Sequence, residues 1–401
     1  MAEADPQYLV SRIPRSNEGK AERVIQLTRL GHAEYQPWAT RVLKARRYYL
    51  GQQWDDIGGT LRRGRLRLTD NVVADDINKR VARFVEAEPV METHGRGAED
   101  FYLGTTWKDL VTYADEWAGD RYDSAKDTRV AIYTYAHIDG DVFEWITWDK
   151  SEEQGLGMVV SELVSGLNVV WGKSARSVQL RDARWVSRFD PVEIEDLELE
   201  FPGWRGRFKS DVPGMFTAGP ESARREHYET SSSSAYPVEM QGTKVYRIEF
   251  WEKRPQKRTR FLLDGKPALT RDDKGNVVEM DEANFEKLPR AQQKVYEDAP
   301  VDDYELWRTI VANNYRLKEE VSEYDTSNNG HGHYPFARYC CTPHPDQTHR
   351  RGKVEPLMGF QDVINQTMSY GLERLFIDSS ALLAIQRGGQ PKSEEAKLDR
   401  L

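Results

Sequence analysis

The side chains that most often bind zinc gather in one short segment of the sequence, as Cys340, Cys341, His344 and His349. Adjacent cysteines cannot easily occupy two corners of a tetrahedral zinc site, and the segment lacks the CxxC and HxxxH spacings. His137, Asp139 and Asp141 are ligand types for a hard cation, but we interpret them as the Asp-Gly turn between a helix and a strand. The sequence therefore predicts neither a metal site nor a bound cofactor.

Motifs of nucleotide-dependent enzymes and of hydrolases do not occur. The sequence contains no GxxxxGK[ST], GxSxG or HExxH motif and no glycine-rich turn of the phosphate-binding type. Carboxylates are frequent, but no spacing singles out a pair for acid–base chemistry or for a nuclease site. We therefore predict that the chain has no catalytic residues and is not an enzyme.

A basic segment between Arg41 and Arg67 is the strongest candidate for binding another molecule. Eight arginines and lysines stand there against two aspartates, with aromatic residues interleaved. Such a segment can neutralise phosphates, pair with an acidic subunit, or form an ordinary solvated helix face. Because the whole chain has 57 basic against 66 acidic residues and a net charge of −9, we favour a subunit contact over a dedicated DNA-binding surface.

The composition describes a folded chain with much polar surface. A length of 401 residues suggests two or three structural units, and 11 Trp, 19 Tyr and 13 Phe argue against disorder. Charged residues make up 31% of the chain, which suits an elongated protein or one that sits beside other chains. No run approaches the ~18 apolar residues of a membrane span, and the N-terminus lacks the features of a signal peptide, so we expect an intracellular protein.

Elements that could position these residues follow from hydrophobic periodicity. Apolar residues at helical spacing predict helices over residues 20–50, divided at Pro37, over 71–88 with Asp70 or Asn71 as the cap, over 100–119 with a continuation to Tyr135, and over 356–375. Short β-branched and aromatic runs predict strands near residues 142–148, 157–164, 168–171, 183–189 and 244–254. The pattern indicates an α+β fold, mainly helical, with a β-rich layer.

We expect six segments along the chain. They are an N-terminal arm (1–19), a helical part (20–135), a β-rich layer (136–209), a flexible polar loop (210–242), a second β-rich and acidic segment (243–345), and a helix followed by a truncated C-terminal segment (346–401).

Four segments of the sequence form a recognisable set. They are RRYYLGQQWDD (46–56), LRDARWVSRFDPVEIEDLELEFPG (180–203), VYRIEFWEKR (245–254), and YPFARY (334–339) followed by RRGKVEPLMGFQDVINQTMSYGLERL (350–375). Together they touch most of residues 40–380. In this order they resemble the portal proteins of tailed double-stranded DNA bacteriophages, especially those of short-tailed phages.

This resemblance implies a protomer of a ring-shaped channel, typically a dodecamer, at one capsid vertex of the virion. Double-stranded DNA would pass through it during packaging and ejection, and the expected protein partners are the major capsid protein, the terminase large subunit and head–tail adaptors. Residues 20–135 would belong to a wing-like region and the helix in 346–401 to the stem or wing. Assembly would take place in the host cytoplasm, with no membrane partner. The alternatives are another virion structural protein, such as an adaptor or internal ejection protein, and a metal-dependent DNA-processing enzyme.

Candidates for subunit contacts come from the segments that carry the resemblance and from the arginine-rich loop. They are Gln53, Trp54, Arg62, Arg63, Arg65, Asp182, Arg184, Trp185, Gln361 and Asn365. A closed ring uses two different, complementary faces of each subunit, and aromatic and arginine side chains are the usual anchors of such faces.

Overall fold

The computed structural model of the chain describes residues 13–14, 16–54, 66–87, 101–117, 125–149, 157–173, 175–210, 243–263, 266–267, 269–271, 277–279, 285, 297–328, 330–342 and 349–388. All structural statements below concern these residues. Most of the predicted N-terminal arm, all but the first residue of the predicted loop at 210–242, and the arginines at 62, 63 and 65 lie outside them.

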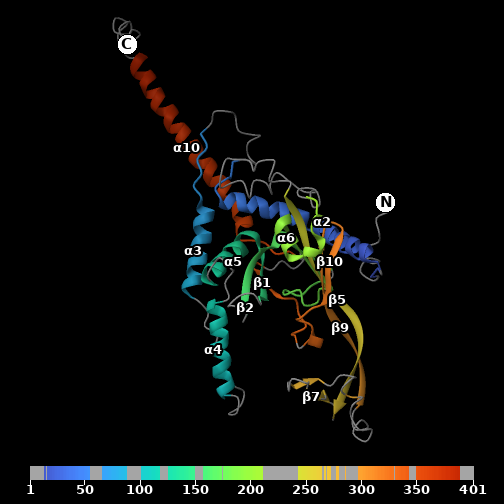
Figure 1. Cartoon of the computed structure of the whole chain (residues 1–401). Helices are drawn as coiled ribbons and strands as arrows, with labels where there is room; N and C mark the ends of the chain where they lie inside the picture. Colours follow the sequence, from blue (N-terminus) through green and yellow to red (C-terminus); the bar gives the residue numbers. More distant parts are fainter. Residues whose placement is uncertain are drawn as a thin grey trace. The chain divides into compact units, whose positions relative to one another are not determined.

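The chain forms two compact units, and each combines segments that are far apart in the sequence (Figure 1). The sheet unit consists of Met1–Pro37 and Phe143–Arg338, and the helical unit consists of Trp38–Val142 and Tyr339–Leu401. Helix α2 (Asn17–Tyr49) is continuous where the sequence predicted two helices, with Pro37 inside it at the boundary of the units. A proline removes one helical hydrogen bond, but buried side chains on both sides of Pro37 keep the helix packed.

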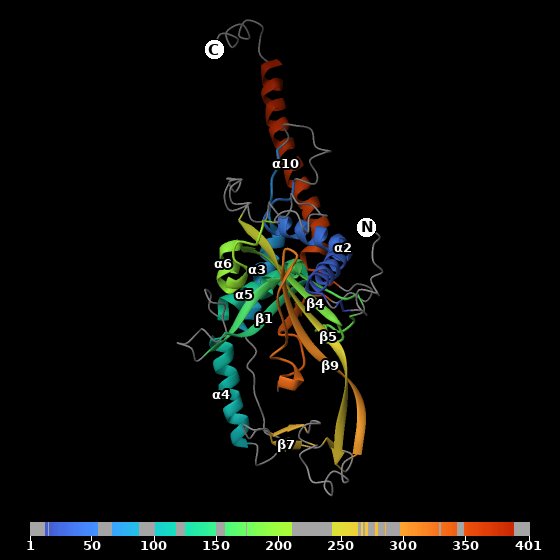
Figure 2. The same ribbon diagram turned by 45° about the vertical axis from the view of Figure 1, so that its right-hand side comes forward.

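The described part of the sheet unit has a six-stranded sheet in the order β10-β9-β5-β4-β3, with β6 paired to the end of β5. Its strands are β3 (Val169–Trp171), β4 (Trp185–Glu193), β5 (Lys244–Leu263), β6 (Lys266–Pro267), β9 (Glu297–Ala312) and β10 (Tyr315–Val321). Each of the sheet's pairings is antiparallel. Figure 2 shows β5 and β9 as one long twisted ribbon.

Further strands form two smaller sheets. One has the order β11-β1-β2, from β1 (Asp141–Asp149), β2 (Met158–Ser165) and β11 (Phe336–Cys340). The other pairs β7 (Leu269–Arg271) with β8 (Val277–Glu279). An apolar cluster that includes Trp145, Trp171 and Trp251 fills the sheet unit, and the short helix α6 (Ile194–Glu200) packs through Leu197 against a second cluster. The predicted α+β class is confirmed.

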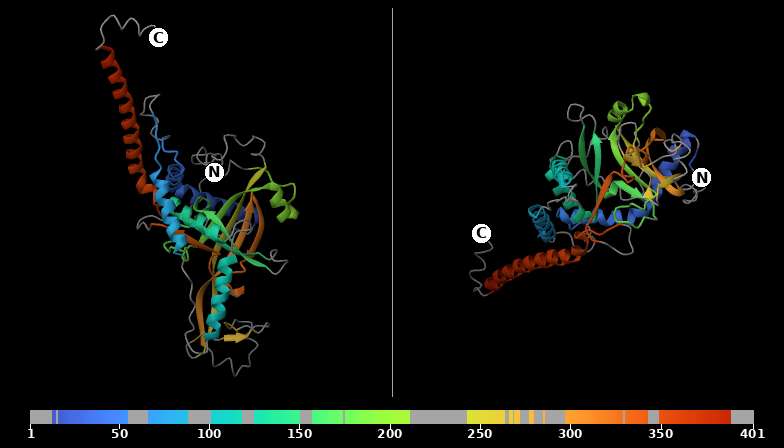
Figure 3. Two further views of the ribbon diagram at one scale, coloured as in Figure 1. Left: turned by 90° about the vertical axis from the view of Figure 1, so that its left-hand side faces the viewer. Right: turned by 90° about the horizontal axis from the view of Figure 1, so that it is seen from below.

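The helical unit contains α3 (Val72–Glu86), α4 (Phe101–Trp117), α5 (Ala125–Asp139), α10 (Val354–Gly388) and the last turns of α2. Figure 3 shows α10 as a single long helix. Val73, Ile77, Val81 and Phe84 form the apolar stripe that the sequence predicts on α3; the first three are buried, whereas Phe84 is exposed. Asn71 caps this helix by accepting a hydrogen bond from the N–H of Ala74. The three buried side chains of the stripe pack with the start of α10 and the end of α5 in one apolar cluster.

The Asp-Gly turn after α5 fits closely against the residues that precede α10. Gly140 has φ +92°, and a Cβ at this position would lie 2.4 Å from the carbonyl oxygen of Arg350. A Cβ on Gly352 would lie 2.0 Å from the carbonyl oxygen of Ile138. Two glycines therefore allow backbone to lie directly on backbone, which fixes where α10 begins.

Candidate functional site: two buried polar networks

Helix α10 presents three polar side chains at intervals of four residues, Gln361, Asn365 and Ser369. Residues four apart lie on one face of a helix, and all three side chains are buried. An apolar residue is the usual occupant of such a face, so each of these groups needs a hydrogen-bond partner inside the protein.

Their partners are backbone groups of residues 68–73, which lead into α3 and form its first residues. The Ser369 hydroxyl accepts from Leu68 N (3.1 Å), Asn365 Oδ1 from Asp70 N (3.2 Å) and Gln361 Oε1 from Val73 N (3.2 Å), while Gln361 Nε2 donates to Asp70 O (2.5 Å). We refer to Gln53, Asn71, Gln361, Asn365 and Ser369 as the amide ladder. Ser369, Asn365 and Gln361 bond to residues 68, 70 and 73 respectively, so α10 and segment 68–73 run in opposite directions.

Two further amides connect the ladder to the end of α2. Gln53 accepts from Asn365 Nδ2 (2.5 Å) and donates to the carbonyl of Tyr48 (2.8 Å) and to Asn71 Oδ1 (3.0 Å). Asn71 donates in turn to the carbonyl of Tyr49 (2.7 Å). The ladder therefore joins the end of α2, the start of α3 and α10, and its members Gln53, Gln361, Asn365 and Ser369 lie in two of the four segments that carry the family resemblance.

Trp54 lies beside the ladder and bonds to the same segment. Its side chain is only 8% exposed. Its Nε1 donates to the carbonyl of Leu68 (3.2 Å) and to the hydroxyl of Thr69 (3.0 Å). Residues on the two sides of the arginine-rich stretch 55–65 are thus tied to each other and, through Leu68, to α10.

Burial makes the ladder energetically important. A buried amide left without its partner costs about 1–3 kcal/mol, and the loss is larger where hydrogen bonds are linked in a network. The ladder contributes little net attraction compared with an apolar contact, but any shift of α10 along segment 68–73 would break several bonds at once. It therefore sets the register of the helical unit.

The acidic residues near the Asp-Gly turn, Asp139 and Asp141, have partners inside the same unit. The guanidinium of Arg46 donates to both carboxylate oxygens of Asp139, with Nε 2.8 Å from Oδ1. Burial raises the pKa of Asp139, and the charge of Arg46 opposes that effect. Asp141 accepts from the N–H of Arg350 (2.8 Å).

Among the residues that the structure describes, no group of three or more His, Cys, Asp and Glu side chains is placed to hold a metal ion.

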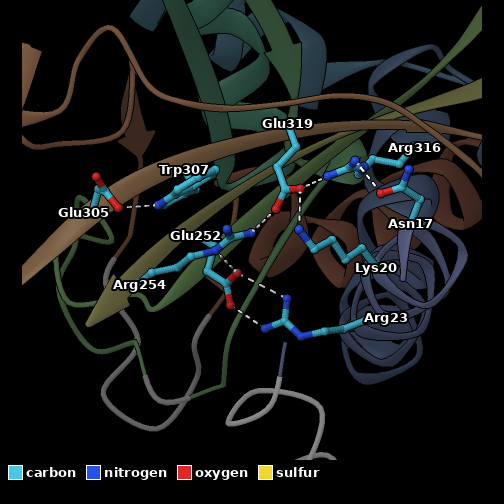
Figure 4. A network of polar contacts seen from close by, with 9 residues as sticks. All are labelled: Asn17, Lys20, Arg23, Glu252, Arg254, Glu305, Trp307, Arg316 and Glu319. Carbon is cyan, nitrogen blue, oxygen red and sulfur yellow. Dashed lines mark hydrogen bonds and ion pairs between the residues drawn. The ribbon is translucent and has the colours of Figure 1, made fainter. Parts of the chain in front are cut away.

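The second network lies in the sheet unit, between the first turns of α2 and the two strands β5 and β10 (Figure 4). Arg23 pairs with Glu252 on β5, Lys20 donates to Glu319 on β10 (2.7 Å), and Arg254 bridges Glu319 (2.8 Å) and Glu252 (3.2 Å). Arg316 also pairs with Glu319 and donates to the side chain of Asn17 (2.5 Å). We refer to the six charged residues Lys20, Arg23, Glu252, Arg254, Arg316 and Glu319 as the ion cluster.

Cations outnumber carboxylates in this cluster by four to two. Burial lowers the pKa of Lys20, and the charges of Arg316 and Arg254 lower it further. The guanidinium of Arg254 lies 4.2 Å from the ring centre of Trp307, whose Nε1 donates to Glu305 (2.7 Å). Within the cluster, the two carboxylates are the groups that join Lys20 and Arg23 of α2 to strands β10 and β5.

The remaining candidates from the sequence lie around β4. Trp185 is buried and stacks on Phe250 with ring centres 5.6 Å apart. Partial burial raises the pKa of Asp182, but hydrogen bonds from the backbone N–H groups of Arg176 and Ser177 outweigh it, so the pKa lies below its ordinary value. Arg184 is half-buried, and its carbonyl accepts from Lys253 N (2.9 Å).

The structure thus divides the predicted contact residues into groups. Five are buried inside one chain: Gln53, Trp54, Trp185, Gln361 and Asn365. Arg184 is half-buried, Asp182 is exposed, and Arg62, Arg63 and Arg65 lie outside the described residues. For the buried side chains we find a role within the protomer, and a contact with a neighbouring subunit stays a prediction for all ten candidates.

Sequence reasoning missed the ion cluster, the Arg46–Asp139 pair and Ser369. A signal for the cluster was present, because Glu252 and Arg254 are two residues apart in a predicted strand and so share one face of it. Ser369 continues the spacing of Gln361 and Asn365 by one more turn.

The chain matches the model of a known protein family. The model of the Phage P22-like portal protein family matches residues 26–380, which includes the whole amide ladder and every element from β1 to β11. No curated protein matches the chain. Within the described residues, no helix is both long and apolar enough to span a bilayer.

Proposed function

The chain belongs to the P22-like phage portal protein family, and from this premise we propose that it forms the ring channel at one capsid vertex through which double-stranded DNA is packaged and later ejected. Proteins of this family are structural components of the bacteriophage virion that serve DNA packaging. The observation that carries the proposal is the family match over residues 26–380, because it extends through both compact units rather than over one motif.

The buried networks support a ring. In a ring of identical subunits each copy contacts the next through the same pair of faces, and small angular errors add up around the circle. A protomer that has to close such a ring benefits from stiff internal connections. The amide ladder in the helical unit and the ion cluster in the sheet unit supply such connections within each unit.

Partners follow from the position at the vertex. The capsid shell would surround the ring, the terminase large subunit would dock on it during packaging, and head–tail adaptors would take that place afterwards. We propose a dodecamer. The arginines at 62, 63 and 65 are our candidates for a contact with an acidic neighbouring surface, since Trp54 and Leu68 fix both flanks of their stretch.

A packaging assay tests this function. Procapsids of the same phage, assembled with and without this chain, are supplied with terminase, ATP and linear DNA, and the DNA protected from nuclease is measured. We expect protection only in procapsids that contain the chain. Equal protection in its absence would show that another protein forms the channel.

A further inference from the structure

The flank of α10 opposite the amide ladder carries large apolar side chains that the described part of the chain leaves exposed. Phe360 is 72% exposed, Val363 is 63% exposed and Ile377 is 66% exposed. At about 100° per residue, Val363 and Ile377 point about 120–160° away from the buried Asn365. We refer to Gly359, Phe360, Val363 and Ile377 as the exposed stripe.

Gly359 adds an independent observation. A Cβ built at this position would meet no atom within 4 Å. A glycine inside a helix costs about 0.5–1 kcal/mol relative to alanine, and nothing in the described part of the chain requires one here. A glycine in the middle of an exposed apolar stripe suits the close approach of another backbone.

The helix also needs cover on more than one side. Residues 374–378 are all exposed, although Leu375 and Ile377 are apolar and point in different directions. A helix that carries apolar side chains on several sides is usually buried in a larger structure. The sequence that follows the helix, GQPKSEEAKLDRL (389–401), is too polar to provide such a cover.

We infer that the exposed stripe of α10 packs against a neighbouring copy of this chain. A cyclic assembly places one copy on each side of every subunit, so it can cover a helix from two directions with a single kind of partner. This inference rests on the proposed ring and identifies one of its contact faces.

Substitutions on the stripe test it against a matched control. Phe360→Asp and Val363→Asp place a charge where a neighbour would pack, and Leu199→Asp does the same at a side chain on α6 that is 80% exposed and outside the stripe. Because all three positions are exposed, we expect circular dichroism and melting temperature to stay as in the wild type. The stripe variants should need at least tenfold more protein to form rings, measured by mass photometry, while Leu199→Asp should assemble normally.

A photo-crosslinking amino acid in place of Phe360 identifies the occupant. Irradiation should produce covalent dimers and higher multiples of this chain. If the wild type forms rings but both stripe variants assemble at the wild-type concentration, or if crosslinks from position 360 stay within one chain, the inference is wrong and the proposed function stands. If the wild type forms no rings, the proposed function fails and this contact with it.

Discussion

Two side-chain amides and one hydroxyl of α10 connect parts of the sequence that are about 300 residues apart. Gln361 and Asn365 each bond both to backbone of segment 68–73 and to another amide. Removal of any of the four amides of the ladder, Gln53, Asn71, Gln361 or Asn365, therefore breaks more than one hydrogen bond.

We predict that Asn365→Ala lowers the free energy of unfolding by about 2–4 kcal/mol, because the buried N–H of Asp70 and the buried side-chain oxygen of Gln53 each lose the hydrogen bond that Asn365 makes to them. Thr367→Ala, on the exposed side of the same helix, is the control and should change it by less than about 0.5 kcal/mol. Urea denaturation followed by tryptophan fluorescence measures both. Equal effects of the two substitutions would contradict the ladder.

Close backbone contact at Gly352 gives a second prediction. Gly352→Ala places a Cβ 2.0 Å from the carbonyl oxygen of Ile138, which must move away, so we expect a loss of about 2 kcal/mol or more. Gly203→Ala is the control, because a Cβ there meets nothing within 4 Å. A thermal melt of both variants decides the point, and a Gly352→Ala protein as stable as Gly203→Ala would show that the α5–α10 approach is looser than described.

Among the elements, α2 depends on charge as well as on apolar packing. Glu319→Gln leaves Lys20, Arg254 and Arg316 close together with one carboxylate fewer, and breaking a buried pair in this way typically costs about 3–5 kcal/mol. Glu320→Gln, on the same strand but more exposed, should cost under about 1 kcal/mol. Chemical denaturation compares them, and a Glu319→Gln protein no less stable than Glu320→Gln would remove the cluster as an anchor of α2.

Lys20 makes this anchor sensitive to pH. Because burial and then Arg316 and Arg254 lower its pKa from 10.5, the folded protein binds this proton less tightly than the unfolded chain. The contribution of Lys20 to stability therefore rises as the pH climbs from the lowered pKa towards 10.5. The difference in unfolding free energy between wild type and Lys20→Met should shift in favour of the wild type over this range. A difference that is constant with pH would show that Lys20 is not perturbed.

Most elements could be predicted from local sequence, because hydrophobic periodicity and capping are local properties. The stripe of Val73, Ile77 and Val81 and the cap at Asn71 are examples. The helix break at Pro37 was wrong, since propensity at one residue is outweighed by packing on either side. Pairings such as Asn365 with Asp70, or Arg23 with Glu252, depend on contacts between distant segments, which periodicity does not encode.

At the scale of the whole molecule, charge bears on how DNA would move through a ring. Each chain carries a net charge of −9, and a ring multiplies it, so its field repels the phosphates of a passing duplex. We predict that purified rings do not retain double-stranded DNA in a filter-binding assay even at low salt. Tight binding that weakens steeply with added salt would mean that a basic surface lines the channel.

The central claim is that many copies of this chain close around an open axis, and negative-stain electron microscopy of the purified protein tests it most directly. We expect class averages with one rotational symmetry and a central hole wide enough for a DNA double helix. Particles the size of a single 46.3 kDa chain at micromolar concentration, with no closed rings, would contradict the account.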